Sequence, residues 1–252
     1  MDKVIVVVGP TGVGKTKMGV ALAKYFNGEV ISGDSMQIYK TMDIGTAKVT
    51  KQEMDGVVHH LIDIKNPDES YSVKDFQDEV RKKIKEITMR NKLPIIVGGT
   101  GLYIKAALYD YQFSDSQIEH QEYVKKYQDY TNEQLYQYLL EIDELSAKEL
   151  HPNNRQRVLR AIAIYESTGV KKSETLAKQK HEMIYDAKFI GLTLDRELLY
   201  QRINERVDLM MEQGLLKEIE SLMEKNYSSD LQSMKAIGYK EWFAYYDKKQ
   251  TL

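Results

Sequence analysis

The sequence predicts an α/β fold in which a parallel sheet carries helices on both faces and a helical insertion interrupts the chain. Short β-branched runs alternate with segments of helical period, a pattern typical of parallel sheets. A glycine-rich loop joins the first such run to the first helical segment, and the composition changes after about residue 111. A chain of 252 residues is long enough for one such domain and a smaller unit.

The first half of the chain supplies most of the expected sheet. Lys3–Gly9 contains five consecutive β-branched residues and predicts a buried strand. A helix is expected from Lys15, with Met18, Leu22 and Tyr25 on one face. The further elements expected here are strands at Glu29–Asp34, His60–Ile64 (weaker) and Leu93–Gly99, and helices at Ser72–Arg90 and from Leu102.

The second half begins with the insertion, expected over 111–187, so that residues 1–110 and 188–252 form the core. The insertion is rich in Tyr, Gln, Glu and Lys, and Leu135, Tyr138 and Leu139 follow a helical period. After it we expect a strand at Lys188–Asp195, then Arg196–Asn226 as one helix or as two broken at Gly214. A last helix is expected from Met234.

Composition narrows the function classes. The chain has no cysteine, which excludes disulfides, thiolate metal sites and cysteine nucleophiles. The apolar run at Val4–Val8 is too short to span a bilayer, and no signal or transit peptide is seen. We therefore expect a cytoplasmic setting with no membrane partner, and we take a monomer as the starting expectation.

Net charge is −2, so any nucleic-acid site must be local. Basic clusters do gather in the insertion, although from charge alone a solvated helix face explains them equally well. These clusters are Arg155, Arg157 and Arg160, Lys171–Lys172, and Lys178–Lys180.

The glycine-rich loop fits the phosphate-binding pattern G-x-x-x-x-G-K-[ST] and lies between a predicted strand and a predicted helix. Its backbone N–H groups would surround phosphate oxygens, with Lys15 adding a positive charge and Thr16 a hydroxyl ligand for Mg²⁺. The sheet is therefore expected to be P-loop NTPase-like. The eight residues of the loop are Gly9, Pro10, Thr11, Gly12, Val13, Gly14, Lys15 and Thr16.

Two further loops are expected at the same edge of the sheet, where ligands of such folds collect. Asp34 follows the second strand and could ligate Mg²⁺ through water or accept a proton; equally, it could cap the next helix. Thr100 follows the strand ending at Gly98 and offers a hydroxyl, with a helix cap as the alternative. The run Pro94–Val97 meets a glycine instead of an aspartate, which disfavours triphosphate hydrolysis.

Taken with these loops, the chain resembles the tRNA dimethylallyltransferase family, also called tRNA isopentenyltransferases. Eight segments carry the resemblance, in order, over nearly the whole chain. They are residues 9–16 (GPTGVGKT), 32–39 (SGDSMQIY), 43–48 (DIGTAK), 59–63 (HHLID), 97–103 (VGGTGLY), 152–161 (PNNRQRVLRA), 202–208 (RINERVD) and 234–241 (MKAIGYKE).

The resemblance implies a donor site and a chemistry. The phosphate loop would bind dimethylallyl diphosphate, and Lys15 and Thr16 with Mg²⁺ would neutralise the leaving pyrophosphate. Asp34 would orient and deprotonate the N6 amine of the target adenine, and Thr100 would hydrogen-bond the bridging oxygen. Arg202 is the candidate for a further cation on the pyrophosphate and Arg206 is its rival; a surface pair with Glu205 or Asp208 is the alternative for either arginine.

The resemblance also implies that a tRNA anticodon stem-loop enters the same cavity, its adenine turned out of the stack. The insertion would then be the arm that grips the RNA. The residues expected to contact tRNA are Asp34, Ser35, Met36, Gln37, Thr100, Gln156, Arg157, Val158, Leu159, Arg160, Met234, Lys235, Ala236, Ile237, Gly238 and Tyr239.

The chain departs from the family pattern in two places, and one further motif needs an interpretation. The basic helix that usually follows the segment 236–241 is not seen before Leu252, and residues 111–121 are fewer than expected. His59 and His60 are neighbours on a predicted strand and would point to opposite faces, so we interpret them as structural and not as a metal site.

Three alternatives remain open. An adenylate dimethylallyltransferase would use a free nucleotide as acceptor, and the insertion and the Arg157 and Arg160 face argue against it. A small-molecule or nucleotide kinase would usually show an arginine-rich lid over the γ-phosphate. A nucleic-acid-binding module with a vestigial loop fits poorly with intact Lys15, Thr16 and Asp34.

Overall fold

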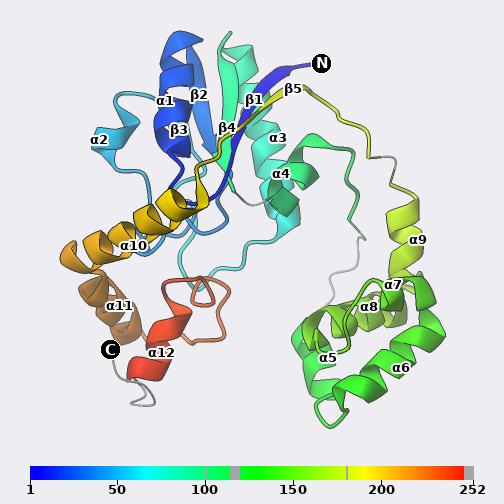
Figure 1. The fold of residues 1–252 in the computed structure, drawn as a ribbon. Coiled ribbons are helices and arrows are strands. Elements are labelled where there is room, and N and C mark those ends of the chain that lie inside the picture. The colour runs from blue at the N-terminus through cyan, green and yellow to red at the C-terminus, as the bar shows by residue number, and fades with distance from the viewer. Residues whose placement is uncertain (100, 114–119, 180, 247–252) are drawn as a thin grey trace. The chain divides into compact units, whose positions relative to one another are not determined.

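The computed structural model describes residues 1–99, 101–113, 120–179 and 181–246 (Figure 1). The chain divides into two compact units, one formed by Met1–Tyr109 with Met183–Leu252 and the other by Asp110–Glu182. The chain returns from the second unit to the first after Glu182, whereas the composition predicted that the insertion ends at residue 187. Tyr109 pairs with Met183 in an antiparallel bridge, and this pairing returns the chain to the first unit before its last strand begins.

The first unit contains the predicted parallel sheet. Its strands lie in the order β3-β2-β4-β1-β5, and every pairing between them is parallel. The carboxyl ends therefore meet at one edge of the sheet, as the loops require. The strands are β1 (Lys3–Val8), β2 (Gly28–Ser32), β3 (His59–His60), β4 (Leu93–Gly98) and β5 (Asp186–Gly191).

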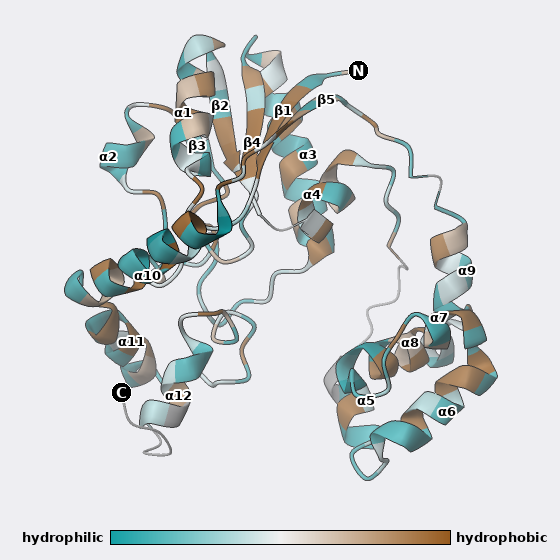
Figure 2. Cartoon of the chain, in the orientation of Figure 1, coloured by the Kyte–Doolittle hydropathy of each residue, from teal (hydrophilic) through white to brown (hydrophobic). Residues whose placement is uncertain are grey.

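Helices cover both faces of this sheet, because alternate strand residues point to opposite sides. Val7, Val30 and Ile95 pack in one apolar cluster with Ala23 of the first helix. Their sequence neighbours, such as Ile96, belong to the larger cluster on the other face. Figure 2 shows how apolar residues concentrate in the strands.

The helices of this unit follow the predicted order with small shifts. Ser72 caps the third helix and forms a reciprocal capping box with Asp75. Gly214 adopts φ 99° and separates two helices, one of the two outcomes expected there. The helices are α1 (Lys15–Tyr25), α2 (Lys51–Met54), α3 (Val73–Met89), α4 (Gly101–Leu108), α10 (Arg196–Glu212), α11 (Leu215–Glu224) and α12 (Lys240–Tyr246).

Two sequence predictions about this unit were wrong. The third strand was expected at His60–Ile64 but covers only His59–His60, because Leu61 and Asp63 adopt positive φ angles of 59° and 54° and turn the chain away. No helix begins at Met234; residues 234–239 form turns, and α12 starts at Lys240. Gly238, with φ 93°, interrupts the helical period there.

The second unit is helical, as its composition predicts. Its apolar residues form a separate cluster that includes Leu135, Leu139, Val158 and Leu159, so it has a core of its own. Its helices are α5 (His120–Lys126), α6 (Asn132–Ile142), α7 (Glu144–Lys148), α8 (Arg155–Thr168) and α9 (Lys172–Ala177). Among the residues described in either unit, none of the helices is both long and apolar enough to cross a membrane.

Candidate active site

The phosphate loop connects β1 to α1, as predicted. Gly12 and Gly14 adopt φ angles of 84° and 94°, which glycine tolerates best. Gly14 is also the residue before α1, and no side chain caps that helix end. The first N–H groups of α1 are therefore available to an anion.

Lys15 folds back over this loop. Its Nζ donates hydrogen bonds to the carbonyl oxygens of Gly9 at 2.9 Å and Pro10 at 2.8 Å. Burial lowers the pKa of Lys15, nearby Asp34 acts to raise it, and Arg206 acts to lower it further. The lysine thus lies within the electrostatic field of both a carboxylate and a guanidinium.

Asp34 follows β2 and faces the loop. One carboxylate oxygen, Oδ1, accepts hydrogen bonds from the backbone N–H groups of Met36 at 2.8 Å and Gln37 at 3.4 Å. The predicted capping role is therefore real, although it involves a turn and not a helix. Within the described part of the chain, Oδ2 has no hydrogen-bond partner, so capping leaves it available for chemistry.

A close approach of two glycines brings the ends of β2 and β4 together. A Cβ atom at Gly98 would lie 2.4 Å from the backbone of Gly33, a distance that no side chain tolerates. Close packing against Gly33 therefore explains why β4 ends in glycine, at the position where hydrolases of this fold often carry aspartate. Thr100, which follows in the same loop, lies outside the described residues.

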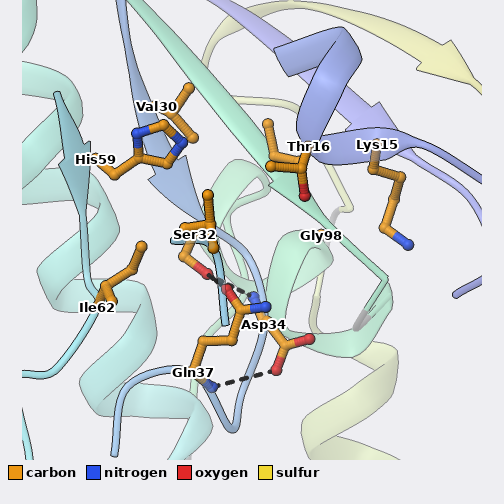
Figure 3. Close-up of a pocket in the computed structure, with 11 residues that line it drawn as sticks. Lys15, Thr16, Val30, Ser32, Asp34, Gln37, His59, Ile62 and Gly98 are labelled. Atoms are coloured by element: carbon orange, nitrogen blue, oxygen red, sulfur yellow. Dashed lines mark hydrogen bonds between the residues drawn. The ribbon is translucent and has the colours of Figure 1, made fainter. Parts of the chain in front are cut away.

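Lys15 and Thr16, the last two residues of the phosphate loop, line one cavity together with Asp34 (Figure 3). Lys15 and Asp34 lie at one side of it, and Val30, His59 and Ile62 lie at the other. The wall is therefore charged on one side and largely apolar on the other. The lining residues are Lys15, Thr16, Val30, Ser32, Asp34, Gln37, Val49, His59, Ile62, Val97 and Gly98.

His59 lies in this wall, a position that the sequence interpretation missed. Its Nδ1 lies 2.9 Å from the carbonyl oxygen of Val57, which orients the ring. Burial lowers the pKa of His59, and a neutral ring suits an apolar wall. Val30 and Ser32 alternate along β2 and point to the same face, so the strand pattern could have predicted that both line the cavity. Val49 and Ile62 reach this face from segments outside β2, and no pattern in the sequence around them predicts it.

Both ends of the Gln37 side-chain amide are hydrogen-bonded within the protein. Its Nε2 donates to the carbonyl oxygens of Ala47 at 3.2 Å and Thr46 at 3.5 Å. Its Oε1 accepts a hydrogen bond from the Ser32 hydroxyl at 3.4 Å. A carbonyl oxygen has two lone pairs, so Gln37 Oε1 can still accept a second hydrogen bond in the cavity that Gln37 and Asp34 both line.

The structure distinguishes the two candidate arginines of α10. Arg206 is half-buried, donates to the carbonyl of Ala47 at 3.4 Å and feels the charge of Asp34. Arg202, the first choice from sequence, is exposed, and its Cβ packs near Gly12 of the phosphate loop. In the described ranges, neither arginine forms an ion pair with Glu205 or Asp208. Arg206 is thus the arginine coupled to Lys15 and Asp34.

The expected RNA contacts divide into exposed and buried positions. Arg157 and Arg160 are exposed on α8, as is Gln156. Val158 and Leu159 are 0% and 1% exposed, so their side chains hold the core of the helical unit and cannot contact RNA.

The second expected RNA segment, 234–239, divides in the same way. Met234, Ala236 and Tyr239 are buried, whereas Lys235 and Ile237 are exposed and Gly238 is half-buried. Side-chain contact with RNA is therefore excluded for the three buried residues in this conformation. Ser35 and Met36, beside Asp34, remain partly accessible.

A parallel sheet with a phosphate loop and a carboxylate at one cavity defines a P-loop-type α/β protein. This chain belongs to the IPP transferase family, whose model matches residues 37–252. Curated relatives extend the similarity over the phosphate loop as well. The tRNA dimethylallyltransferase of Bacillus cereus is 56% identical over 254 aligned residues, covering 100% of this chain and 80% of the relative; that of Bacillus anthracis is 55% identical, with 81% of its length covered.

Solved structures agree. The tRNA isopentenylpyrophosphate transferase of Bacillus halodurans is 47% identical, with a TM-score of 0.73 over 100% of this chain and 80% of that one. A eukaryotic dimethylallyltransferase acting on tRNA is 35% identical, with a TM-score of 0.85 over 99% of this chain and 64% of the other. Both likenesses confirm the α/β fold and the family.

Proposed function

We propose that this chain transfers a dimethylallyl group from dimethylallyl diphosphate to the N6 amine of the adenine next to the anticodon of tRNA, releasing pyrophosphate. One observation carries the proposal: Lys15, Thr16 and Asp34 line a single cavity. A site for the leaving group and a proton acceptor thus lie close enough to serve one reaction. The names of the relatives supply the donor and acceptor classes.

The donor diphosphate would take the place of the loop's own carbonyl groups. Lys15 would exchange its bonds to Gly9 and Pro10 for phosphate oxygens, because a charge-assisted bond is the stronger one. Arg206 would add a second positive charge, which is most valuable as negative charge grows on the departing pyrophosphate. The apolar wall around Val30 and Ile62 is the side of the cavity that would contact the hydrocarbon chain.

The acceptor amine would approach from the Asp34 side. An adenine N6 amine carries two N–H donors, and Asp34 Oδ2 and Gln37 Oε1 are two acceptors on one turn. As the nitrogen forms its bond to the allylic carbon, the carbon–oxygen bond breaks and its electron pair leaves with pyrophosphate. The proton lost by the nitrogen passes to Asp34, which acts as the general base.

The donor set at the cavity fits Mg²⁺, a hard ion that binds through a few protein oxygens, phosphate and water. The hydroxyl of Thr16 is the protein oxygen that would hold it directly, and Asp34 would reach it only through water, which leaves its free oxygen to act as the base. In the described ranges, no three His, Asp or Glu side chains form a metal-binding group, so phosphate would supply much of the coordination. Bound there, Mg²⁺ would neutralise part of the charge on the leaving group.

The helical unit would supply the grip on RNA. Arg157 and Arg160 are exposed and three residues apart on α8, a spacing that puts them on one face. Two cations on one face can bind successive backbone phosphates without reading sequence. We further propose that the chain acts in the cytoplasm, in keeping with a sequence that has no cysteine, and that it acts as a monomer.

The test is a comparison of acceptors. The protein is incubated with Mg²⁺ and labelled dimethylallyl diphosphate, together with unmodified tRNA in one tube and AMP in another. Parallel tubes hold labelled ATP with small acceptors. Label in tRNA at the adenine after the anticodon is the expected result. Label in AMP alone would make the chain an adenylate dimethylallyltransferase, and phosphate transfer from ATP would make it a kinase.

A further inference from the structure

A sharp turn at Asp43–Gly45 binds a carboxylate from a distant part of the chain. The backbone N–H groups of Asp43 and Ile44 each donate to Glu218 Oε2 at 2.8 Å, and that of Gly45 donates to Oε1 at 3.1 Å. Three successive N–H groups pointing to one anion form a backbone nest. Glu218 lies on α11, about a hundred and seventy residues further along the chain.

Tyr239 completes this carboxylate site. Its hydroxyl donates to Glu218 Oε1 at 2.6 Å, and its side chain is 1% exposed. Burial, and next the hydrogen bond to Glu218, raises the pKa of Tyr239, so the phenol stays protonated as a donor. A Cβ on Gly45 would lie 2.6 Å from the Tyr239 ring, so the turn and the ring fit only because residue 45 is glycine.

The other end of the same turn holds Gln37. The carbonyl groups of Thr46 and Ala47 accept the Gln37 amide. Buried Lys48 fastens the turn to its surroundings by donating to the carbonyl of Tyr39 and to the carboxylate of Asp63. The contacts therefore run from Glu218 through the turn to the side chain that lines the cavity beside Asp34.

We propose that Glu218 is a positioning residue for the acceptor: by fixing the turn at Asp43–Gly45, it sets the orientation of Gln37. This inference rests on the proposed function. The phosphate loop is held separately by β1 and α1. Arg206 does contact the turn, at the carbonyl of Ala47, but through one long hydrogen bond of 3.4 Å, and its position is set by its own helix. The donor site therefore depends on the turn less than Gln37 does. Loss of Glu218 should therefore affect the binding of tRNA more than that of the donor.

The experiment compares Glu218→Gln with a control on the same helix. All four groups that face the carboxylate are donors, so the amide nitrogen of glutamine must face a donor and the isosteric change should still disturb the turn. The control is Glu224→Gln, an exposed carboxylate at the end of α11. Tyr239→Phe removes one hydrogen bond and keeps the ring, and serves should Glu218→Gln fold poorly.

In Glu218→Gln we expect the KM for an unmodified tRNA anticodon stem-loop to rise about tenfold, while the KM for dimethylallyl diphosphate stays within about twofold. Tyr239→Phe should shift the first value about threefold, as expected for one hydrogen bond. Hydrogen exchange should become faster at the amides of residues 43–45 in both variants. Glu224→Gln should match the wild-type chain in every measurement.

Two outcomes would overturn the inference. Faster exchange at residues 43–45 with an unchanged KM for tRNA would show that the turn does not position the acceptor site. A proportional loss of activity with both substrates would reduce Glu218 to a purely structural role. A wild-type chain that leaves tRNA unlabelled would instead contradict the proposed function, and this is seen before any variant is compared.

Discussion

The strand β2 has a carboxylate near each end, and the protein treats the two in opposite ways. Glu29, at the amino end, has a side chain only 4% exposed that meets His60 at 2.6 Å, Arg90 at 2.6 Å and Lys92 at 3.0 Å. Burial by itself would raise its pKa. The hydrogen bonds from these three partners overcome that effect and lower the pKa of Glu29 to about 2.

Asp34, beyond the carboxyl end, has a cavity in place of such partners. Lys15 and Arg206 lie within range of its charge, but Lys15 donates to backbone carbonyls. Among the described residues, only the turn's N–H groups bond to the carboxylate. The difference teaches that a carboxylate with all its partners supplied by the protein supports the fold. One that is left partly without partners beside a cavity is available to a substrate.

The largest expected effect comes from Asp34→Asn. Asparagine keeps an oxygen to accept the N–H of Met36 but cannot take up a proton as a base. Turnover should fall about a thousandfold with little change in donor affinity, because general-base catalysis is worth about 10²–10⁴. Single-turnover transfer to tRNA and equilibrium binding of dimethylallyl diphosphate are the measurements. An equal loss in both would break the comparison, since Asp34 would then be a binding group only.

Glu29→Gln should do the reverse and affect stability alone. Removing the carboxylate leaves the cations Arg90 and Lys92 without their counter-charge and the His60 ring without its carboxylate partner, which should cost about 3 kcal/mol of unfolding free energy. The activity of the remaining folded protein should be unchanged, because these contacts lie at the opposite end of β2. Urea unfolding beside the same transfer assay measures both. A loss of turnover without a loss of stability would contradict the prediction.

The pH dependence of Glu29 gives a second measurement on this pair. Its folded pKa is depressed, so its contribution to stability is fully present above the ordinary value of 4.5 and is lost as pH falls toward about 2. The stability difference between the wild-type chain and Glu29→Gln should therefore shrink through that window. A constant difference down to pH 2 would show that the carboxylate is not stabilised by its charge.

The next effect sharpens the description of the Asp34 end. Arg206→Ala should raise the KM for dimethylallyl diphosphate about thirtyfold, because a half-buried cation beside Lys15 is lost. Arg202→Ala, one helical turn away and exposed, is the matched control and should change the same KM by about twofold or less. A reversal of the two values would restore Arg202 as the pyrophosphate ligand.

The smallest effect extends the same contrast to the helical unit. Arg155 donates to the carbonyls of Tyr130 and Tyr127, whereas the guanidinium of Arg157 is exposed and has no partner in the described residues. Arg157→Ala should weaken tRNA binding about fivefold and flatten its salt dependence. Arg155→Ala should lower the melting temperature instead. Unchanged tRNA binding in Arg157→Ala would return α8 to a scaffold role.

Local sequence determined a large part of this protein. The continuous β-branched runs, their alternation with helical segments and the glycine-rich loop predicted the succession of strands and helices along the chain and the place of Lys15 and Thr16 between the first strand and the first helix. A break at Gly214 was one of two outcomes expected there, and the helix predicted at Ser72–Arg90 differs from α3 by one residue at each end. These features depend on neighbours a few residues apart, which is why they can be predicted from one sequence.

Only the tertiary structure decided which charged side chains have all their partners within the protein and which keep an oxygen or nitrogen available to a ligand. Glu29 finds His60 and Arg90 from other elements, and Glu218 reaches the turn at Asp43 from the far end of the chain. The choice of Arg206 over Arg202 likewise follows from how α10 lies against the loop. Such pairings depend on which elements the fold brings together. The pKa of a charged side chain likewise depends on its burial and its partners, and a local sequence pattern contains neither.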